Sequence, residues 1–190
     1  MDLFARVRCR CFEEGKLSPC PLPVEYLYID RDDRFNSKKL DDAHARFTYR
    51  QFQARYGQLE NAFIAWRNHP CQHELGNFCM MWVGGFDECG AFLEYCSEIG
   101  KNRLPVLSHI FPFGNGWAFP EDSQKAEDVK EALKELGYFD SWLVAKTKSS
   151  SANARIAETN EKMQGAVSVS SALRKLLKAS LETGNPIRWC

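Results

Sequence analysis

Residues 3–11, LFARVRCRC, are the stretch that decides the fold. Apolar side chains and cysteines occupy every second position, and arginines fill most of the positions between them. Alternation with a period of two is typical of a strand with one buried face. The sequence therefore predicts a half-buried strand with an apolar face of Leu3, Ala5, Val7, Cys9 and Cys11 and an opposite stripe of Arg6, Arg8 and Arg10.

Helical periodicity appears in four later segments. In each of them apolar residues recur every three or four positions, which is typical of a helix with one buried stripe. We expect these helices over residues 52–66, 89–99, 121–136 and 168–183. Gly100, Gly137 and Gly184 follow three of the segments directly, and a glycine at that position commonly ends a helix.

Further short strands are expected over residues 24–30, 78–83, 104–111, 142–146 and 187–190. Because helices and strands do not alternate in a regular β-α-β order, the predicted fold class is α+β, with a mixed or antiparallel sheet and three to five helices packed on it. A length of 190 residues fits one domain, residues 1–190, with residues 149–165 as a candidate flexible segment.

Composition narrows the function classes. The 25 basic residues balance the 25 acidic ones, whereas a dedicated nucleic-acid binder normally has a basic excess. No run reaches the roughly 20 apolar residues that cross a bilayer. Arginines stand near the start of the chain, where a signal peptide needs an apolar core. We therefore expect a cytoplasmic protein, without a nucleic-acid or membrane partner, that keeps its eight cysteines reduced.

The cysteines allow two interpretations. Cysteines on apolar stripes usually pack as small hydrophobic residues. Alternatively, four soft ligands could hold a tetrahedral zinc ion. The one-residue spacing argues against zinc, because Cα atoms two residues apart on an ideal strand are roughly 6.5–7 Å apart and the strand would need distortion. The sequence thus favours cysteines that pack in the core and no cofactor. The alternative is a zinc site formed by Cys9, Cys11, Cys71 and His73.

Catalytic motifs are weak in this sequence. Cys71 lies between His69 and His73, which suggests an activated thiol and a small cysteine hydrolase. Catalytic pairs are assembled across a fold rather than along the sequence, however, and the common nucleotide, serine-hydrolase and zinc-protease motifs are absent. The acidic run Asp30, Asp32 and Asp33 could bind Mg²⁺ but is typical of a turn. We therefore expect a protein that is not an enzyme.

Two candidate surfaces could bind a partner protein. Guanidinium groups of Arg6, Arg8 and Arg10 could bind acidic side chains or phosphates of a partner, although the sequence favours their pairing with acids of this chain such as Glu25. The aromatic loop 111–120 could anchor a partner through Phe113 and Trp117, or fold over the core.

Three segments resemble a group of small bacterial proteins found in defence and toxin–immunity settings. They are RCRCFEEGK (8–16), LPVLSHIFPFGNGWAFPE (104–121) and ASLETGNPIRWC (179–190), about a fifth of the chain. The resemblance implies a biological setting and carries no functional residues with it. Together with the missing catalytic motifs, it predicts an immunity-type protein that neutralises a toxin by covering it. The alternatives are a zinc-stabilised regulatory domain and a cysteine hydrolase.

Overall fold

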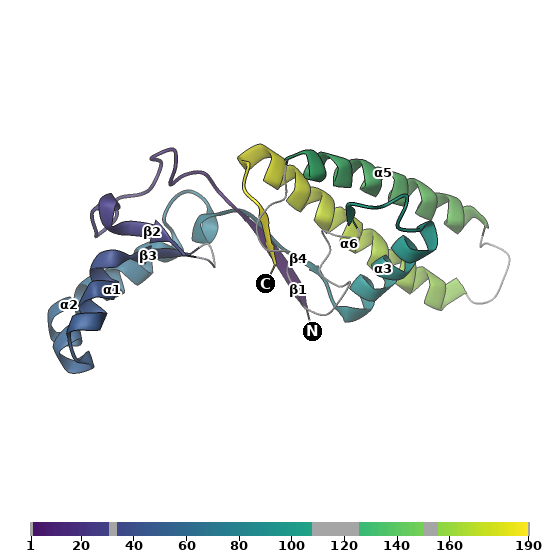
Figure 1. The fold of residues 1–190 in the computed structure, drawn as a ribbon. Helices are drawn as coiled ribbons and strands as arrows, with labels where there is room; N and C mark the ends of the chain where they lie inside the picture. The colour runs from purple at the N-terminus through teal and green to yellow at the C-terminus, as the bar shows by residue number, and fades with distance from the viewer. Residues whose placement is uncertain (1, 31–33, 108–125, 150–155, 190) are drawn as a thin grey trace. The chain divides into compact units, whose positions relative to one another are not determined.

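The computed structural model describes residues 2–30, 34–107, 126–149 and 156–189. Over these residues the chain forms five α-helices and two small antiparallel sheets, which confirms the predicted α+β class (Figure 1). It divides into two compact units: unit 1 is Met1–Val7 with Cys79–Cys190, and unit 2 is Arg8–Phe78. Among the described residues, no helix combines the length and apolar character needed to cross a membrane. That residues 1–190 behave as one domain stays a prediction.

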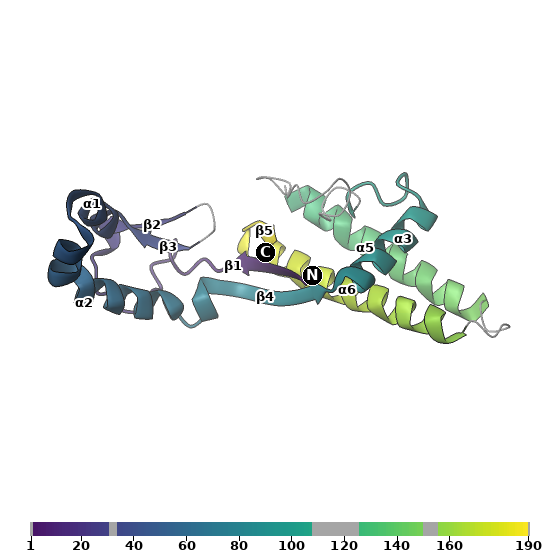
Figure 2. The same cartoon turned by 90° about the horizontal axis from the view of Figure 1, so that it is seen from below.

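Unit 2 is built around a pair of helices and a hairpin (Figure 2). Its elements are η1 (Val24–Tyr26), β2 (Leu27–Ile29), β3 (Phe35–Ser37), α1 (Lys38–Arg46), α2 (Tyr49–Asn68) and η2 (Glu74–Gly76). Strands β2 and β3 pair antiparallel, with Leu27 opposite Ser37. The buried stripe predicted for the helix over residues 52–66 is confirmed in α2, because Phe52, Phe63 and Trp66 are buried in one core. The ring of Phe35 meets that of Trp66 edge-on at 5.3 Å.

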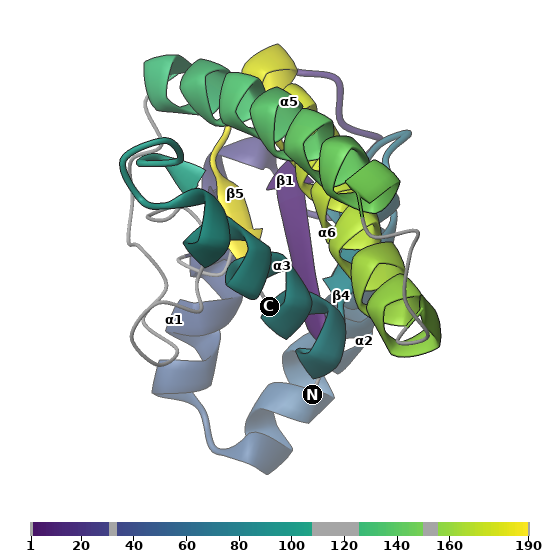
Figure 3. The ribbon, with the colours of Figure 1, turned by 90° about the vertical axis from the view of Figure 1, so that its right-hand side faces the viewer.

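Unit 1 places three helices on one face of a three-stranded sheet (Figure 3). The strands lie in the order β4 (Asn77–Gly84), β1 (Leu3–Arg8) and β5 (Ile187–Trp189), and the helices are α3 (Phe86–Ile99), α5 (Ala126–Ser149) and α6 (Ile156–Thr183). Strand β1 pairs antiparallel with β5, so that Arg6 stands opposite Arg188. Helix α6 packs on both α3 and α5. The predicted alternation is confirmed over Leu3–Val7.

Two helices are longer than their sequence patterns predicted. The predicted strand 142–146 is wrong, because α5 continues through Gly137 to Ser149. Phe139 and Leu143 extend the buried stripe of α5, and this burial outweighs the roughly 1 kcal/mol that an interior glycine costs a helix. Residues 156–165, expected in the flexible segment, form the first turns of α6, where Met163 is buried.

Several short elements also differ from the predicted ones. Helix α1 was not predicted, because only Leu40 and Ala43 of its nine residues are buried and its apolar pattern is weak. The expected strand 24–30 shortens to β2, preceded by the 3₁₀ turn η1. Residues 104–106 form a bend and a turn rather than a strand, with Leu104 buried, and Leu107 is helical; the rest of segment 104–111 lies outside the described residues.

Gly165 allows α6 to approach α3 closely, and this makes a first prediction. A Cβ at Gly165 would lie 2.9 Å from Cγ and 3.1 Å from Cα of Glu88, so α3 would have to shift. We expect Gly165→Ala to lower the free energy of unfolding by about 1–3 kcal/mol in urea titrations, in spite of alanine's better helix propensity. In the control Gly90→Ala, no atom lies within 4 Å of the new Cβ, and we expect a gain of up to about 1 kcal/mol. Equal effects would contradict the close crossing.

Candidate metal centre

Four potential ligands of a soft metal ion meet within unit 2. Cys9, Cys11, Cys71 and His73 each offer one ligand atom, and these atoms all lie within 4.8 Å of one another. The Sγ atoms of Cys9 and Cys71 are 3.7 Å apart. Nδ1 of His73 lies 3.4 Å from Sγ of Cys11 and 3.6 Å from Sγ of Cys71. The structure thus brings together the four residues of the zinc alternative.

These separations match the edges of a tetrahedron around zinc. Zinc–sulfur bonds of about 2.3 Å and zinc–nitrogen bonds of about 2.0–2.1 Å place two sulfurs about 3.8 Å apart and a sulfur and a nitrogen about 3.5 Å apart. The observed sulfur–sulfur distance of 3.7 Å and sulfur–nitrogen distances of 3.4 and 3.6 Å agree with both values. These are three of the six edges of such a tetrahedron, and all six separations are within 4.8 Å.

The first pair of ligands lies on a turn, which corrects the predicted strand. Strand β1 ends at Arg8, so Cys9 and Cys11 follow it and do not alternate along it. The N–H of Lys16 donates to the carbonyl of Cys11 at 2.7 Å and that of Glu14 to the carbonyl of Arg10 at 2.9 Å. Because the chain bends here, the two sulfurs can face one point. The spacing objection assumed an ideal strand, and the turn removes it.

The second pair lies on a comparable turn. After His73 the chain enters η2, where Leu75 and Gly76 have positive φ values of 52° and 72°. Positive φ strains a residue with a side chain such as Leu75, and Gly76 reaches it without that cost. The N–H of Cys9 donates to the carbonyl of Gly76 at 2.9 Å and joins the two turns. Gly76 lies three residues after His73, and this position was the sequence signal from which the turn could have been predicted.

Each pair repeats one local hydrogen bond. The N–H of His73 donates to Sγ of Cys71 at 3.4 Å. The N–H of Cys11 donates in the same way to Sγ of Cys9, two residues before it. Bonds of this kind favour the thiolate over the thiol and orient the sulfur toward a metal ion. Both turns are therefore shaped to present ligand sulfurs.

Without a cation, the electrostatics of the cluster favour neutral thiols. Burial raises the pKa of the Cys9 thiol. Burial, followed by the neighbouring thiols of Cys9 and Cys71, raises the pKa of Cys11 to about 12. Packing three thiolates together costs free energy unless a positive charge lies between them, and a divalent ion reverses this balance. The cluster therefore suits a cation that displaces its protons.

The arrangement is that of a closed site. Cys9 and Cys11 are buried, while Cys71 and His73 are half-buried. Three cysteines and one histidine fill a tetrahedral coordination shell, which is typical of structural zinc, whereas catalytic zinc keeps one position for water. The hydrolase alternative would use the same Cys71 and His73 atoms. His69 instead ends α2, where its N–H donates to the carbonyl of Trp66.

The other predicted site residues do not form a cluster with these four, or lie outside the residues that the structure describes. Arg8 pairs with Glu13 at 2.5 Å and Arg10 with Glu14 at 3.9 Å, both acids of the turn after Cys11. Arg6 is half-buried on β1. Asp30 caps a turn by accepting from the N–H of Arg34 at 2.9 Å. Phe113 and Trp117, like Asp32 and Asp33, lie outside the described residues.

Two further cysteines confirm the core interpretation. Cys89 and Cys96 lie on the buried stripe of α3. Burial raises the pKa of Cys89 to about 11 and that of Cys96 to about 12. Because the thiolate is the reactive form, both thiols are poor nucleophiles at neutral pH.

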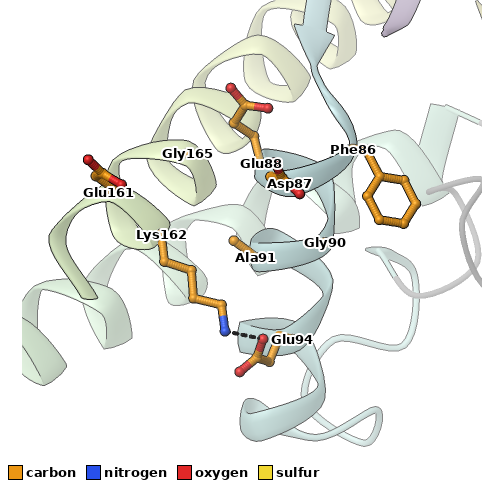
Figure 4. A pocket seen from close by; sticks show the side chains of 9 residues that line it. All are labelled: Phe86, Asp87, Glu88, Gly90, Ala91, Glu94, Glu161, Lys162 and Gly165. Carbon is orange, nitrogen blue, oxygen red and sulfur yellow. Dashed lines mark ion pairs between the residues drawn. The ribbon is translucent and has the colours of Figure 1, made fainter. Parts of the chain in front are cut away.

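A groove of about 630 Å³ lies between α3 and α6 in unit 1 (Figure 4). Carboxylates dominate its polar lining, and Lys162 forms an ion pair with Glu94 at 2.5 Å across it. Glu88 accepts from the N–H of Gly85 at 2.9 Å and caps α3. The ion pair joins the two helices and Glu88 caps α3, and we assign no ligand to the groove.

Comparison with protein-family profiles, curated proteins and solved structures found no match. The resemblance of three segments to toxin–immunity proteins therefore stays a prediction. The functional proposal below is based on the geometry of the four-residue cluster.

Proposed function

We propose that this chain is a zinc-stabilised regulatory domain in which Cys9, Cys11, Cys71 and His73 hold one structural zinc ion. The observation that supports it is the meeting of four ligand atoms within 4.8 Å, with three of their six separations at the edge lengths of a zinc tetrahedron. The ion would polarise no substrate, because all four positions belong to the protein. Its role is to fix the fold that presents a binding surface.

The position of the ligands indicates what the ion would stabilise. They lie near the two ends of unit 2, Arg8–Phe78, and the helices α1 and α2 lie between them in the sequence. A domain of about 70 residues buries a limited core, and small domains commonly gain stability from a metal or disulfides. Linking Cys9 to Cys71 closes a long loop and lowers the entropy of the unfolded chain. The zinc ion would therefore hold the two ends of unit 2 together.

Metal analysis tests this proposal. Protein purified without chelators should contain one zinc per chain by elemental mass spectrometry, and the zinc should survive dialysis. Replacement by Co²⁺ should give the intense visible absorption of a tetrahedral thiolate site. A folded protein that contains no metal and binds neither ion would overturn the proposal.

We propose as a second function that the chain binds and neutralises a partner protein. The sequence resemblance implies that this partner is a toxin. It is supported by three exposed apolar side chains on the sheet of unit 1: Phe4, Met80 and Trp82. Co-expression with a toxin encoded beside this gene should restore growth of the host. Continued growth arrest would count against the immunity role.

A further inference from the structure

Backbone hydrogen bonds hold the two turns of the metal cluster against each other. The N–H of Cys9 donates to the carbonyl of Gly76 at 2.9 Å, and the N–H of Ser18 donates to the carbonyl of Pro70 at 2.8 Å. One of these bonds lies before Cys71 in the sequence of its turn and the other lies after it. The backbone therefore places the sulfurs of Cys9 and Cys71 next to each other in the folded unit.

The sulfurs of Cys9 and Cys71 are close enough to be joined. They are 3.7 Å apart, and a disulfide bond is about 2.05 Å long, so a disulfide needs an approach of about 1.7 Å. The two residues are 62 positions apart in the sequence. A bond between them closes a long loop and lowers the entropy of the unfolded chain, whereas a bond between Cys9 and Cys11 closes almost no loop.

Exposure gives the two sulfurs different roles. Cys9 is 3% exposed, while Cys71 is half-buried and is the sulfur that a small solute reaches. The thiolate is the reactive form of cysteine, and a cysteine that binds zinc is a thiolate. The proposed ion would therefore keep Cys71 in a form that reacts with an oxidant, and Cys9 would be a second thiolate directly behind it.

We propose that the cluster is a redox-sensitive site, at which a peroxide joins Cys9 to Cys71 in a disulfide and the zinc ion is released. This inference rests on the first proposed function, because it needs the ion. The thiolate of Cys71 attacks one oxygen of hydrogen peroxide and the O–O bond breaks, which leaves a sulfenic acid on Cys71 and, after protonation, one water. The thiolate of Cys9 then attacks the sulfur of Cys71 and displaces hydroxide, which takes up a proton to form a second water. The two sulfurs together lose two electrons, and the peroxide gains them.

The reaction removes two of the four ligands of the ion. Cys11 and His73 remain, and two ligands do not fill the tetrahedral shell of a structural zinc ion. The disulfide joins the same two turns that the ion joined, so the four residues stay near one another until a dithiol reduces the bond. Zinc binding would then follow the redox state of Cys9 and Cys71.

The inference is tested on the full-length protein, purified with its zinc and treated with hydrogen peroxide in small excess. Zinc released to a coloured chelator should reach one per chain, while the untreated protein releases none over the same time. Thiols counted in the denatured protein should fall from eight to six. Peptide mapping without reductant should find Cys9 linked to Cys71, and a dithiol with added zinc should restore one zinc per chain.

Two variants separate the disulfide from metal binding. Cys71→His keeps four zinc ligands but cannot form the disulfide, so we expect it to bind one zinc and to lose it to peroxide roughly tenfold more slowly than the wild type. Cys20→Ser is the matched control, because Cys20 is half-buried in the same unit and is not a ligand, and it should release zinc as the wild type does. The disulfide mapped in the wild-type protein tests the inference even if Cys71→His fails to bind zinc.

The outcomes distinguish this inference from the proposed zinc site. A protein that contains no zinc before peroxide is added contradicts the zinc site itself. A protein that contains one zinc and keeps it in peroxide retains the structural site and overturns the redox inference alone. Release without a disulfide between Cys9 and Cys71, release that a dithiol does not reverse, or equally fast release from Cys71→His would also overturn it.

Discussion

Replacing Cys11 with serine is expected to abolish zinc binding and to unfold unit 2. A serine hydroxyl is a poor zinc ligand, so the ion would lose one of its four bonds. Structural zinc supplies about 10–16 kcal/mol of apparent binding free energy in small domains, which is as large as the whole stability of about 5–15 kcal/mol of a typical protein. We expect zinc content to fall from one per chain to near zero. Far-ultraviolet circular dichroism should show loss of the helices α1 and α2, and proteases should cut within residues 8–78.

Cys20 supplies the matched control for this prediction. It is a half-buried cysteine of the same unit and packs against the core of unit 2, yet it is not among the four ligands. We expect Cys20→Ser to keep one zinc per chain and to lose about 1 kcal/mol at most, because it exchanges one small side chain for another. A strong chelator should reproduce the Cys11→Ser result in the wild-type protein and in Cys20→Ser, and added zinc should reverse it. If Cys11→Ser and Cys20→Ser behave alike, the four residues do not form a metal site.

The sequence predicted much of the fold because several elements carry strong periodic patterns. The α2 stripe that includes Phe52 and Trp66 and the alternation of Leu3, Ala5 and Val7 each matched one period over several residues, and the structure confirms both. Helix α1 lacked such a pattern, and its position depends on contacts with α2 that no local signal records. Gly137 was given too much weight as a helix end, since buried residues on both sides of it hold α5 together.

The four residues of the candidate site were grouped from sequence as the zinc alternative, but their arrangement was not predicted. Zinc was ranked below core packing because Cys9 and Cys11 were assigned to an ideal strand. The decisive features are the end of β1 at Arg8 and the hydrogen bond from Cys9 to Gly76, which joins residues 67 positions apart. A contact between such distant positions is set by the whole of unit 2. Gly15 and Gly76, both with positive φ shortly after a ligand, were the local signs that turns would follow each pair.

Phe139→Ala should cause a large loss of stability in unit 1. Phe139 is fully buried on α5, and its ring centroid lies 4.7 Å from that of Phe92 on α3. Removing a buried phenylalanine side chain leaves a cavity and typically costs about 3–5 kcal/mol. We expect a loss of this size in urea unfolding monitored by circular dichroism. Zinc content should stay at one per chain, because all four ligands belong to unit 2.

The matched control is Val144→Ala on the same helix. Val144 is 56% exposed, so its truncation should change the free energy of unfolding by no more than about 0.5 kcal/mol. Similar losses for the two variants would mean that the chain beyond Gly137 is not a buried helix. Loss of zinc from Phe139→Ala would mean that the metal site depends on the helices of unit 1. Zinc content and the free energy of unfolding therefore report on different units, because the ligands lie in unit 2 and Phe139 packs in unit 1.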